Sequence, residues 1–268
     1  MIPPRLVVLT FDDGERSHFT RAAPILERHG FSATFFITAG LGFEDKERYV
    51  TWDEVKALHE AGFEIGNHTL AHRNVQTQSA AEFRADLEAL ECLFQEHGLP
   101  RAKTFCYPGY RVSREAVEVL TAQGYQFARR GIFPEYPRDK SGENGPAYDP
   151  ETDHPLLVPT TGASGLRWTF EEFDAALDQA RAGKIAVLCF HGLPGHHPQS
   201  GTQLEKFARF MDYLDRRRIY GHCHGRPGRI CRPYHWPGRS LRTDPAARRR
   251  RAGRILNFTF PPTWKAKK

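Results

Sequence analysis

Residues 5–14 read RLVVLTFDDG, and this stretch decides the fold. Residues 6–9 are apolar without interruption, which is typical of a strand buried on both faces of a parallel sheet. Two adjacent carboxylates, Asp12 and Asp13, follow at once, and Gly14 supplies a turn residue. In parallel β/α folds the reacting groups lie at the C-terminal ends of the strands. The stretch therefore predicts the first strand of such a fold and a candidate site at its end.

The same alternation of β-rich runs and amphipathic stretches continues to about residue 220. Near-continuous apolar strands separated by helices indicate parallel β/α units, and about seven of them favour a barrel over an open sheet. Residues 129–165 interrupt the alternation and predict a long irregular loop at the rim of a substrate groove. Thr169 and Glu172 form a capping-box pattern. The predicted strands are 5–11, 33–37, 63–67, 104–107, 126–128, 154–159 and 185–190, and the predicted helices are 19–29, 52–61, 80–97, 113–122, 169–182 and 202–218.

Charge divides the chain into two parts. Of 38 Lys and Arg and 32 Asp and Glu, residues 221–268 hold 13 basic and one acidic, which leaves 25 basic and 31 acidic residues elsewhere. We therefore predict a catalytic domain over 1–220 and a poorly structured basic tail over 221–268. A disrupted reading frame near Tyr220 and a genuine tail for anionic partners both remain open. We expect no nucleic-acid partner despite the basic charge.

The remaining composition concerns location and redox state. No run of about 18 apolar residues is present, so no transmembrane helix is predicted. The first residues lack a basic segment followed by an apolar one, so no secretory signal is predicted and a cytoplasmic location is expected. Five widely spaced cysteines favour reduced thiols over a disulfide framework. No oligomeric state is predicted.

Polar clusters follow four of the predicted strands. His68 and His72 are separated by three residues, so a tight loop or helical turn can aim both rings at one point. Two imidazoles and one carboxylate form a facial ligand set that leaves positions open for water and substrate. A metal ion in such a set lowers the pKa of water from about 16 towards about 7. The clusters are residues 10–14, 67–72, 106–111 and 189–192.

The two neighbouring carboxylates at residues 12 and 13 can have different roles, one as metal ligand and the other as general base. His191 can protonate the leaving group, and backbone N–H groups of the turn from Tyr107 to Gly109 can support an oxyanion. Taken singly, each piece has a simpler interpretation: a turn, a surface pair of histidines, and a loop histidine. Four clusters after four strands favour one shared site.

These residues resemble the polysaccharide deacetylase family, also called the NodB-homology domain or carbohydrate esterase family four. The resemblance covers about residues 5–218 and rests on Thr-Phe-Asp-Asp-Gly at 10–14, His-Thr-Leu-Ala-His at 68–72 and Leu-Cys-Phe-His at 188–191. It implies a distorted (β/α)7 TIM-like barrel and metal-dependent removal of acetyl groups from an N- or O-acetylated carbohydrate. The implied ion is Zn²⁺, with Co²⁺, Ni²⁺ or Mn²⁺ as alternatives. The implied roles are Asp12 as base, His191 as acid, Asp13, His68 and His72 as ligands, and Leu188 in the acetyl pocket.

Two positions depart from the family's pattern. Where the family usually has an arginine that contacts the base aspartate, this chain has Cys106, and Arg111 follows soon after. Where the family has Asp-Trp to tune the acid histidine, the nearest candidate is Trp168, preceded by Arg167. These departures leave the substrate open. A hydrolase of a cyclic amide, ureide or formyl amide on the same barrel is one alternative, and a non-catalytic carbohydrate- or nucleic-acid-binding protein is another.

Overall fold

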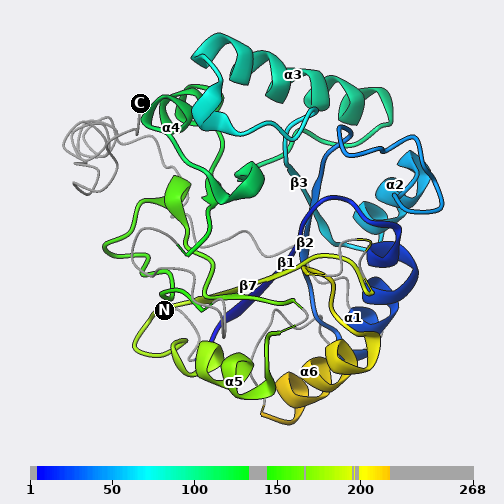
Figure 1. The fold of residues 1–268 in the computed structure, drawn as a ribbon, viewed down its shortest axis with the longest axis vertical. Coiled ribbons are helices and arrows are strands. Elements are labelled where there is room, and N and C mark those ends of the chain that lie inside the picture. The colour runs from blue at the N-terminus through cyan, green and yellow to red at the C-terminus, as the bar shows by residue number, and fades with distance from the viewer. Residues whose placement is uncertain (1–4, 133–143, 166, 195, 197–198, 218–268) are drawn as a thin grey trace. The chain divides into compact units, whose positions relative to one another are not determined.

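A seven-stranded parallel sheet organises the computed structural model of this chain (Figure 1). The structure describes residues 5–132, 144–165, 167–194, 196 and 199–217. The strand order is β5-β4-β3-β2-β1-β7-β6, so β1 lies in the middle and pairs with both β2 and β7. The strands are β1 (Val7–Phe11), β2 (Thr34–Ile37), β3 (Glu64–Asn67), β4 (Thr104–Cys106), β5 (Phe127–Arg129), β6 (Gly162–Ala163) and β7 (Ala186–Phe190).

The sheet curls into a distorted barrel whose edge strands, β5 and β6, are bridged by neighbouring segments and not by each other. Arg129 at the end of β5 forms a parallel bridge with Val158, and Asn144 forms an antiparallel bridge with Gly162 of β6. Helices lie around the outside of the curl (Figure 1). The predicted (β/α)7 architecture is confirmed.

Capping residues in the sequence mark where several of the helices begin. Capping boxes, in which a Ser or Thr and a Glu three residues later satisfy free backbone N–H groups, begin α2, α3 and α5. The predicted box of Thr169 and Glu172 is one of them. The helices are η1 (His18–Ala22), α1 (Ala23–His29), α2 (Trp52–Glu60), η2 (Val75–Thr77), α3 (Ala80–Glu96), η3 (Pro108–Tyr110), α4 (Arg114–Ala122), η4 (Pro155–Leu157), α5 (Phe170–Asp178) and α6 (Leu204–Arg216). None of these described helices is long and apolar enough to cross a membrane.

Two predictions about the chain between β5 and α5 are wrong. Most of the predicted strand at 154–159 is the 3₁₀ turn η4, because Pro155 has no N–H to donate to a sheet and His154 Nδ1 accepts the Leu156 N–H, while Val158 after the turn bridges to Arg129. The sixth strand is β6, which lies inside the predicted loop 129–165. Residues 133–143 of that loop and the predicted basic tail 221–268 lie outside the described residues.

Aromatic side chains fill the layer between the sheet and its helices. The rings of Phe11 and Phe190 stack with centroids 5.4 Å apart, and Phe207 of α6 packs edge-on against both. A Cβ on Gly162 would lie 2.5 Å from a ring carbon of Trp168, so only glycine lets β6 approach that indole. Because the apolar residues are buried on the outer side of the sheet, the polar strand-end residues are left to converge on the inner side.

Candidate active site

The ends of β1 and β3 bring a carboxylate and two imidazoles together. Asp13 Oδ1 lies 3.3 Å from His68 Nε2 and 3.3 Å from His72 Nε2. Asp13 and His68 are buried, while the His72 side chain keeps 21% of its surface exposed. The three residues predicted as metal ligands are therefore adjacent, with an approach from solvent on the His72 side.

The tautomer of His68 tests whether this group fits a metal ion. His68 Nδ1 lies 2.7 Å from the Cys106 carbonyl oxygen, which can only accept, so Nδ1 must donate. In the neutral ring Nε2 then carries a lone pair, and that lone pair faces the carboxylate of Asp13. Two acceptors at this distance require a cation or a proton between them, and a carbonyl behind a ligating histidine is the usual support of a metal site. The donor set fits a divalent ion.

Two other groups in the described part of the chain have ligand atoms within 4.8 Å of one another, Asp12 with Cys189 and His191, and Asp12 with His68 and Cys106. Both depend on Asp12, whose carboxylate already contacts the guanidinium of Arg129. That positive charge repels a cation, so the Asp13 group is the better fit.

The loop that carries the histidines is held by short polar contacts. Asn67 Oδ1 accepts the Thr69 N–H at 2.8 Å, Thr69 Oγ1 accepts the His72 N–H at 3.0 Å, and Asp86 Oδ1 accepts the Ala71 N–H at 2.8 Å. Thr69 and His72 have φ values of +63° and +51°, and Asp13 has +75°. Non-glycine residues in this region are strained, and such strain gathers at functional sites.

Arg129 at the end of β5 holds the buried carboxylate of Asp12. One guanidinium nitrogen contacts both Asp12 oxygens, and the other donates to Thr160 Oγ1 at 2.7 Å. Burial pushes the pKa of Asp12 up, but Arg129, helped by His68 and His191, outweighs it, so the pKa of Asp12 is lowered. Burial also pushes the pKa of Asp13 up, but the adjacent imidazoles of His68, His72 and His191 outweigh it and hold the pKa of Asp13 well below its usual range. Both carboxyl groups are therefore ionised at neutral pH.

Arg129 was not among the site residues predicted from the sequence. A signal for it was present, because Arg129 stands directly after the predicted strand 126–128, as the predicted site residues stand after their strands. Arg111, the arginine that was named, is exposed.

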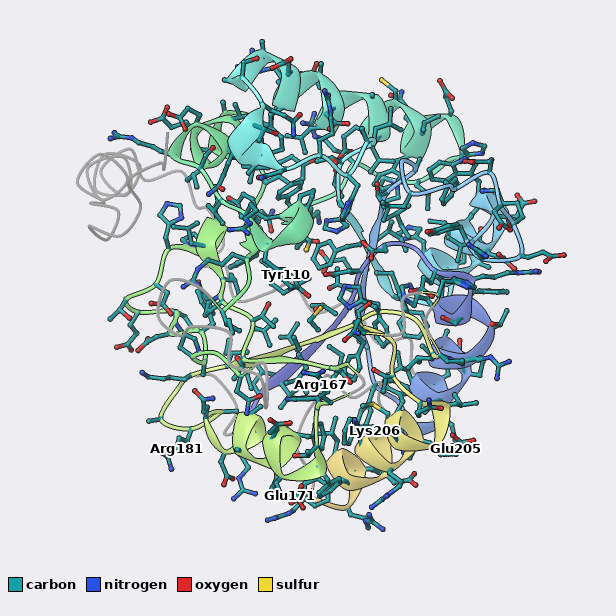
Figure 2. All side chains as sticks on the ribbon, in the orientation of Figure 1. Tyr110, Arg167, Glu171, Arg181, Glu205 and Lys206 are labelled. Carbon is teal, nitrogen blue, oxygen red and sulfur yellow. The ribbon has the colours of Figure 1, made fainter. Side chains whose placement is uncertain are left out.

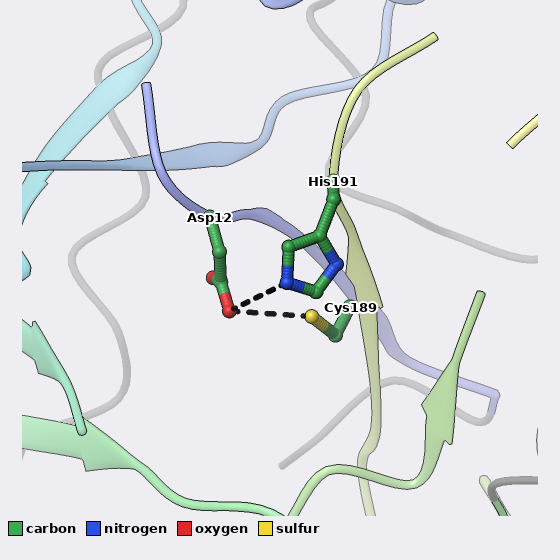
Figure 3. Close-up of side chains that lie close together, drawn as sticks. All are labelled: Asp12, Cys189 and His191. Carbon is green, nitrogen blue, oxygen red and sulfur yellow. Dashed lines mark hydrogen bonds and ion pairs between the residues drawn. The ribbon is translucent and has the colours of Figure 1, made fainter. Parts of the chain in front are cut away.

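His191 follows β7 and faces the two carboxylates. Its Nε2 lies 4.0 Å from Asp12 Oδ2 (Figure 3) and 3.8 Å from Asp13 Oδ2. Its side chain keeps 16% of its surface exposed. Nε2 therefore points at the two carboxylates, while part of the imidazole remains open to solvent.

Two buried thiols complete the inner wall. Cys106 Sγ lies 3.6 Å and Cys189 Sγ 3.4 Å from Asp12 Oδ2. Cys106 also accepts from Arg129 at 2.9 Å, and Cys189 contacts the Tyr110 hydroxyl at 3.3 Å. Tyr110 lies toward the centre of the curl in Figure 2, whereas Glu171 lies on its outer rim. Burial raises the pKa of both thiols, so they stay protonated and unreactive.

The structure corrects the oxyanion prediction at Tyr107. The Tyr107 N–H donates to the Arg129 carbonyl at 3.0 Å, and its hydroxyl donates to the Leu156 carbonyl, so neither donor is free. Gly109 lies exposed in η3.

Leu188 and Trp168 lie on the outer side of the sheet. Cys189 faces Asp12, and because side chains alternate along a strand, Leu188 faces away from the site. Its register partner Gly162 has its Cβ direction toward Trp168, which fits this orientation. Trp168 is buried against Phe173 and other rings, so both Trp168 and Leu188 point away from Asp12 into the apolar core, and Arg167 is exposed. Apolar core packing is the physical reason for both corrections.

The sequence of this chain is similar to those of known deacetylases. Residues 2–128 match the family model of polysaccharide deacetylases. A peptidoglycan-N-acetylmuramic acid deacetylase of Bacillus subtilis is 28% identical over 135 residues, which are 49% of this chain and 41% of that protein. The matched regions span less than half the length of the curated relatives.

Solved structures share the fold at low sequence identity. A peptidoglycan N-acetylglucosamine deacetylase bound to a hydroxamate-type benzamide has a TM-score of 0.56 and 18% identity, over 81% of this chain and 85% of that one. A Bacillus anthracis protein described as a pseudoenzyme of carbohydrate esterase family four has a TM-score of 0.53 and 17% identity, over 81% and 63%. The shared fold alone therefore does not establish activity. The segment that matches the family model includes Asp13, His68 and His72, so this part of the chain is similar to the polysaccharide deacetylases, and the chain shares the fold of solved members of that family.

Proposed function

We propose that this protein is a metal-dependent hydrolase that removes acetyl groups from an N-acetylated or O-acetylated carbohydrate. The observation that carries the proposal is the His68 tautomer, which leaves a bare nitrogen facing Asp13 at 3.3 Å. The acceptor-lined space beside His72 has the charge and donor types of a divalent cation site.

The proposed ligands are Asp13, His68 and His72. Two imidazoles and one carboxylate suit Zn²⁺, and Co²⁺, Ni²⁺ or Mn²⁺ are also compatible. When bound, such an ion acts as a Lewis acid that polarises the acetyl carbonyl and acidifies water. The carbonyl of Cys106 keeps the His68 ring in the ligating tautomer.

Asp12 is the proposed general base. Its lowered pKa keeps it ionised near neutral pH, so it can accept the proton of the attacking water. A carboxylate has about four lone-pair sites. Its contacts with Arg129 therefore leave capacity for that proton.

His191 is the proposed general acid. An amide is cleaved only when its leaving nitrogen receives a proton, and His191 Nε2 points into the space above Asp12 and Asp13. The base and the acid thus face the same reacting centre from β1 and β7.

The substrate class rests on the relatives. Two of the proteins above are named as deacetylases of peptidoglycan sugars, and a chitin deacetylase of Colletotrichum lindemuthianum is 31% identical over 88 residues. An N-acetylglucosamine oligomer is therefore the first substrate to test, beside a panel of cyclic and formyl amides.

Metal analysis of the purified full chain, compared with His68→Ala, tests the site first. We expect about one equivalent of divalent ion in the wild type and loss of it in the variant. Release of acetate from the oligomer should stop with a chelator and return with Zn²⁺ or Co²⁺. Undiminished turnover in chelated protein would overturn the metal proposal, and turnover confined to the small amides would overturn the carbohydrate proposal.

A further inference from the structure

Glu15 is a buried carboxylate that binds the loop after His191. Glu15 is 1% exposed, and its Oε1 accepts the Gly192 N–H at 3.0 Å while its Oε2 accepts the His196 N–H at 3.1 Å. Within the described residues, its ion-pair partner is His196 Nε2, 3.9 Å away. Burying a carboxylate without a close Lys or Arg is costly, and such groups are retained where they fix a conformation.

The contacts join two segments that are far apart in sequence. Glu15 follows the base and ligand pair after β1, and Gly192 follows His191 directly. Ser17 Oγ adds a third contact by accepting the Leu193 N–H at 2.9 Å. Two side chains of the segment after β1 therefore hold three N–H groups of the loop after β7.

The His191 ring has little else to orient it. Its Nδ1 is buried and has no hydrogen-bond partner among the described residues. A catalytic imidazole is usually oriented by a carboxylate or carbonyl at its second nitrogen. Here the direction of the ring depends on where the backbone at His191 and Gly192 lies. Glu15 holds this backbone, with support from Ser17 at Leu193 and from the Thr202 N–H, which donates to the Gly192 carbonyl at 2.9 Å.

We infer that Glu15 is a positioning residue for the acid histidine, His191. Through the N–H groups of Gly192 and His196 it holds the loop so that the imidazole faces Asp12 and Asp13. This inference rests on the proposed function of His191 as acid. A shift of about 1 Å in a catalytic group reduces a rate by about 100-fold, so a modest loosening of the loop is enough to measure.

The test uses two leaving groups. In an N-acetylglucosamine oligomer the sugar nitrogen must receive a proton as its bond to the acetyl carbon breaks, whereas nitrophenolate leaves 4-nitrophenyl acetate without a proton. Glu15→Ala should therefore lower kcat on the oligomer by about 100-fold and keep kcat on the nitrophenyl ester within about threefold, with KM and bound metal little changed. Glu15→Gln keeps one acceptor oxygen and should fall between. His191→Ala should show the same selectivity.

Glu64→Ala is the matched control, because it removes another glutamate carboxylate, one that accepts from the Thr34 hydroxyl, at the opposite end of the strands. Equal losses on both substrates in Glu15→Ala, or no loss on either, would overturn the inference. If the wild type does not cleave the oligomer, or His191→Ala shows no selectivity, the proposed function fails instead. Hydrogen exchange of residues 191–196 then decides the positioning role: faster exchange in Glu15→Ala but not in Glu64→Ala supports it, and unchanged exchange overturns it.

Discussion

One nitrogen of Arg129 contacts both carboxylate oxygens of Asp12, from β5 across the inside of the sheet to β1. The resemblance to the family implied an arginine at the end of β4, where this chain has Cys106. The Cys106 thiol lies against the same guanidinium at 2.9 Å. The positive charge is therefore present beside Asp12, but a different strand supplies it.

Removal of this guanidinium should impair both stability and turnover. Arg129→Ala leaves the Asp12 carboxylate buried without its partner, which typically destabilises a protein by about 3–5 kcal/mol. We also expect at least a 100-fold lower kcat, because the base loses both its orientation and its ionised form. Urea unfolding and acetate release measure the two effects.

The double variant Cys106→Arg with Arg129→Ala provides the matching rescue. It returns a guanidinium to the end of β4, so it should recover part of the lost turnover, whereas Cys106→Ala alone should have a small effect. Wild-type turnover in Arg129→Ala with full metal content would show that Asp12 does not need this partner.

Asp86 should control metal affinity from outside the ligand set. It is buried on α3 and accepts the Ala71 N–H, and so it holds the loop between His68 and His72. Asp86→Ala should weaken metal binding by about 10- to 100-fold, the usual effect of removing such a support. Competition with a chromogenic chelator measures the change. Asp86→Asn retains the acceptor oxygen and should bind near the wild-type level; equal weakening in both variants would point to charge and not to the hydrogen bond.

Trp168 should matter for stability and little for chemistry. Its ring packs on Phe173, Phe190 and Phe210, and its Nε1 donates to Asn144. Trp168→Ala should cost about 3–5 kcal/mol in the free energy of unfolding. Trp168→Phe should retain most of kcat and KM in the acetate assay. A large rise in KM in Trp168→Phe would instead indicate contact with substrate.

His18 should make the fold sensitive to acid. It is buried between Phe11 and Phe35, and burial lowers its pKa from 6.5 to about 4. The folded protein thus binds a proton at His18 less well than the unfolded chain does. The free energy of unfolding that depends on neutral His18 is therefore fully present above about pH 6.5 and is lost as the pH falls toward 4. A shift of this size corresponds to about 3 kcal/mol.

The measurement is urea unfolding at pH 7 and pH 4.5 with a chelator present, so that metal release does not contribute. His18→Phe should lose less stability between the two pH values than the wild type does. Equal losses in the two proteins would assign the acid sensitivity to other groups.

The sequence was sufficient for the strand ends that carry Asp12, Asp13, His68 and His72, because these residues are close in the chain to apolar runs with a clear period. Which side chains of β7 face the site was not predictable from the sequence. Residues 186–190 are all buried, so no alternation of polar and apolar residues shows that Cys189 and not Leu188 faces the site.

The role of Glu15 had no sequence signal at all. Its partners are backbone N–H groups about 177 residues away, and every non-proline residue carries such a group. Arg129 could have been predicted as a site residue, because it directly follows a predicted strand. Its pairing with Asp12 could be found only from the order of the strands around the curl.

Because β1 pairs with β7, the site combines residues that are far apart in the sequence and that are synthesised at different times. Thr10 Oγ1 donates to the Leu188 carbonyl across 178 positions, and the register continues to Phe11 and Phe190. The proposed metal ligands lie within the first 72 residues, but His191 joins them only after the chain has closed on itself. Contacts of such long range form late and slowly. A nascent chain on the ribosome can therefore assemble the ligand half early, but it gains the acid only when synthesis has passed β7.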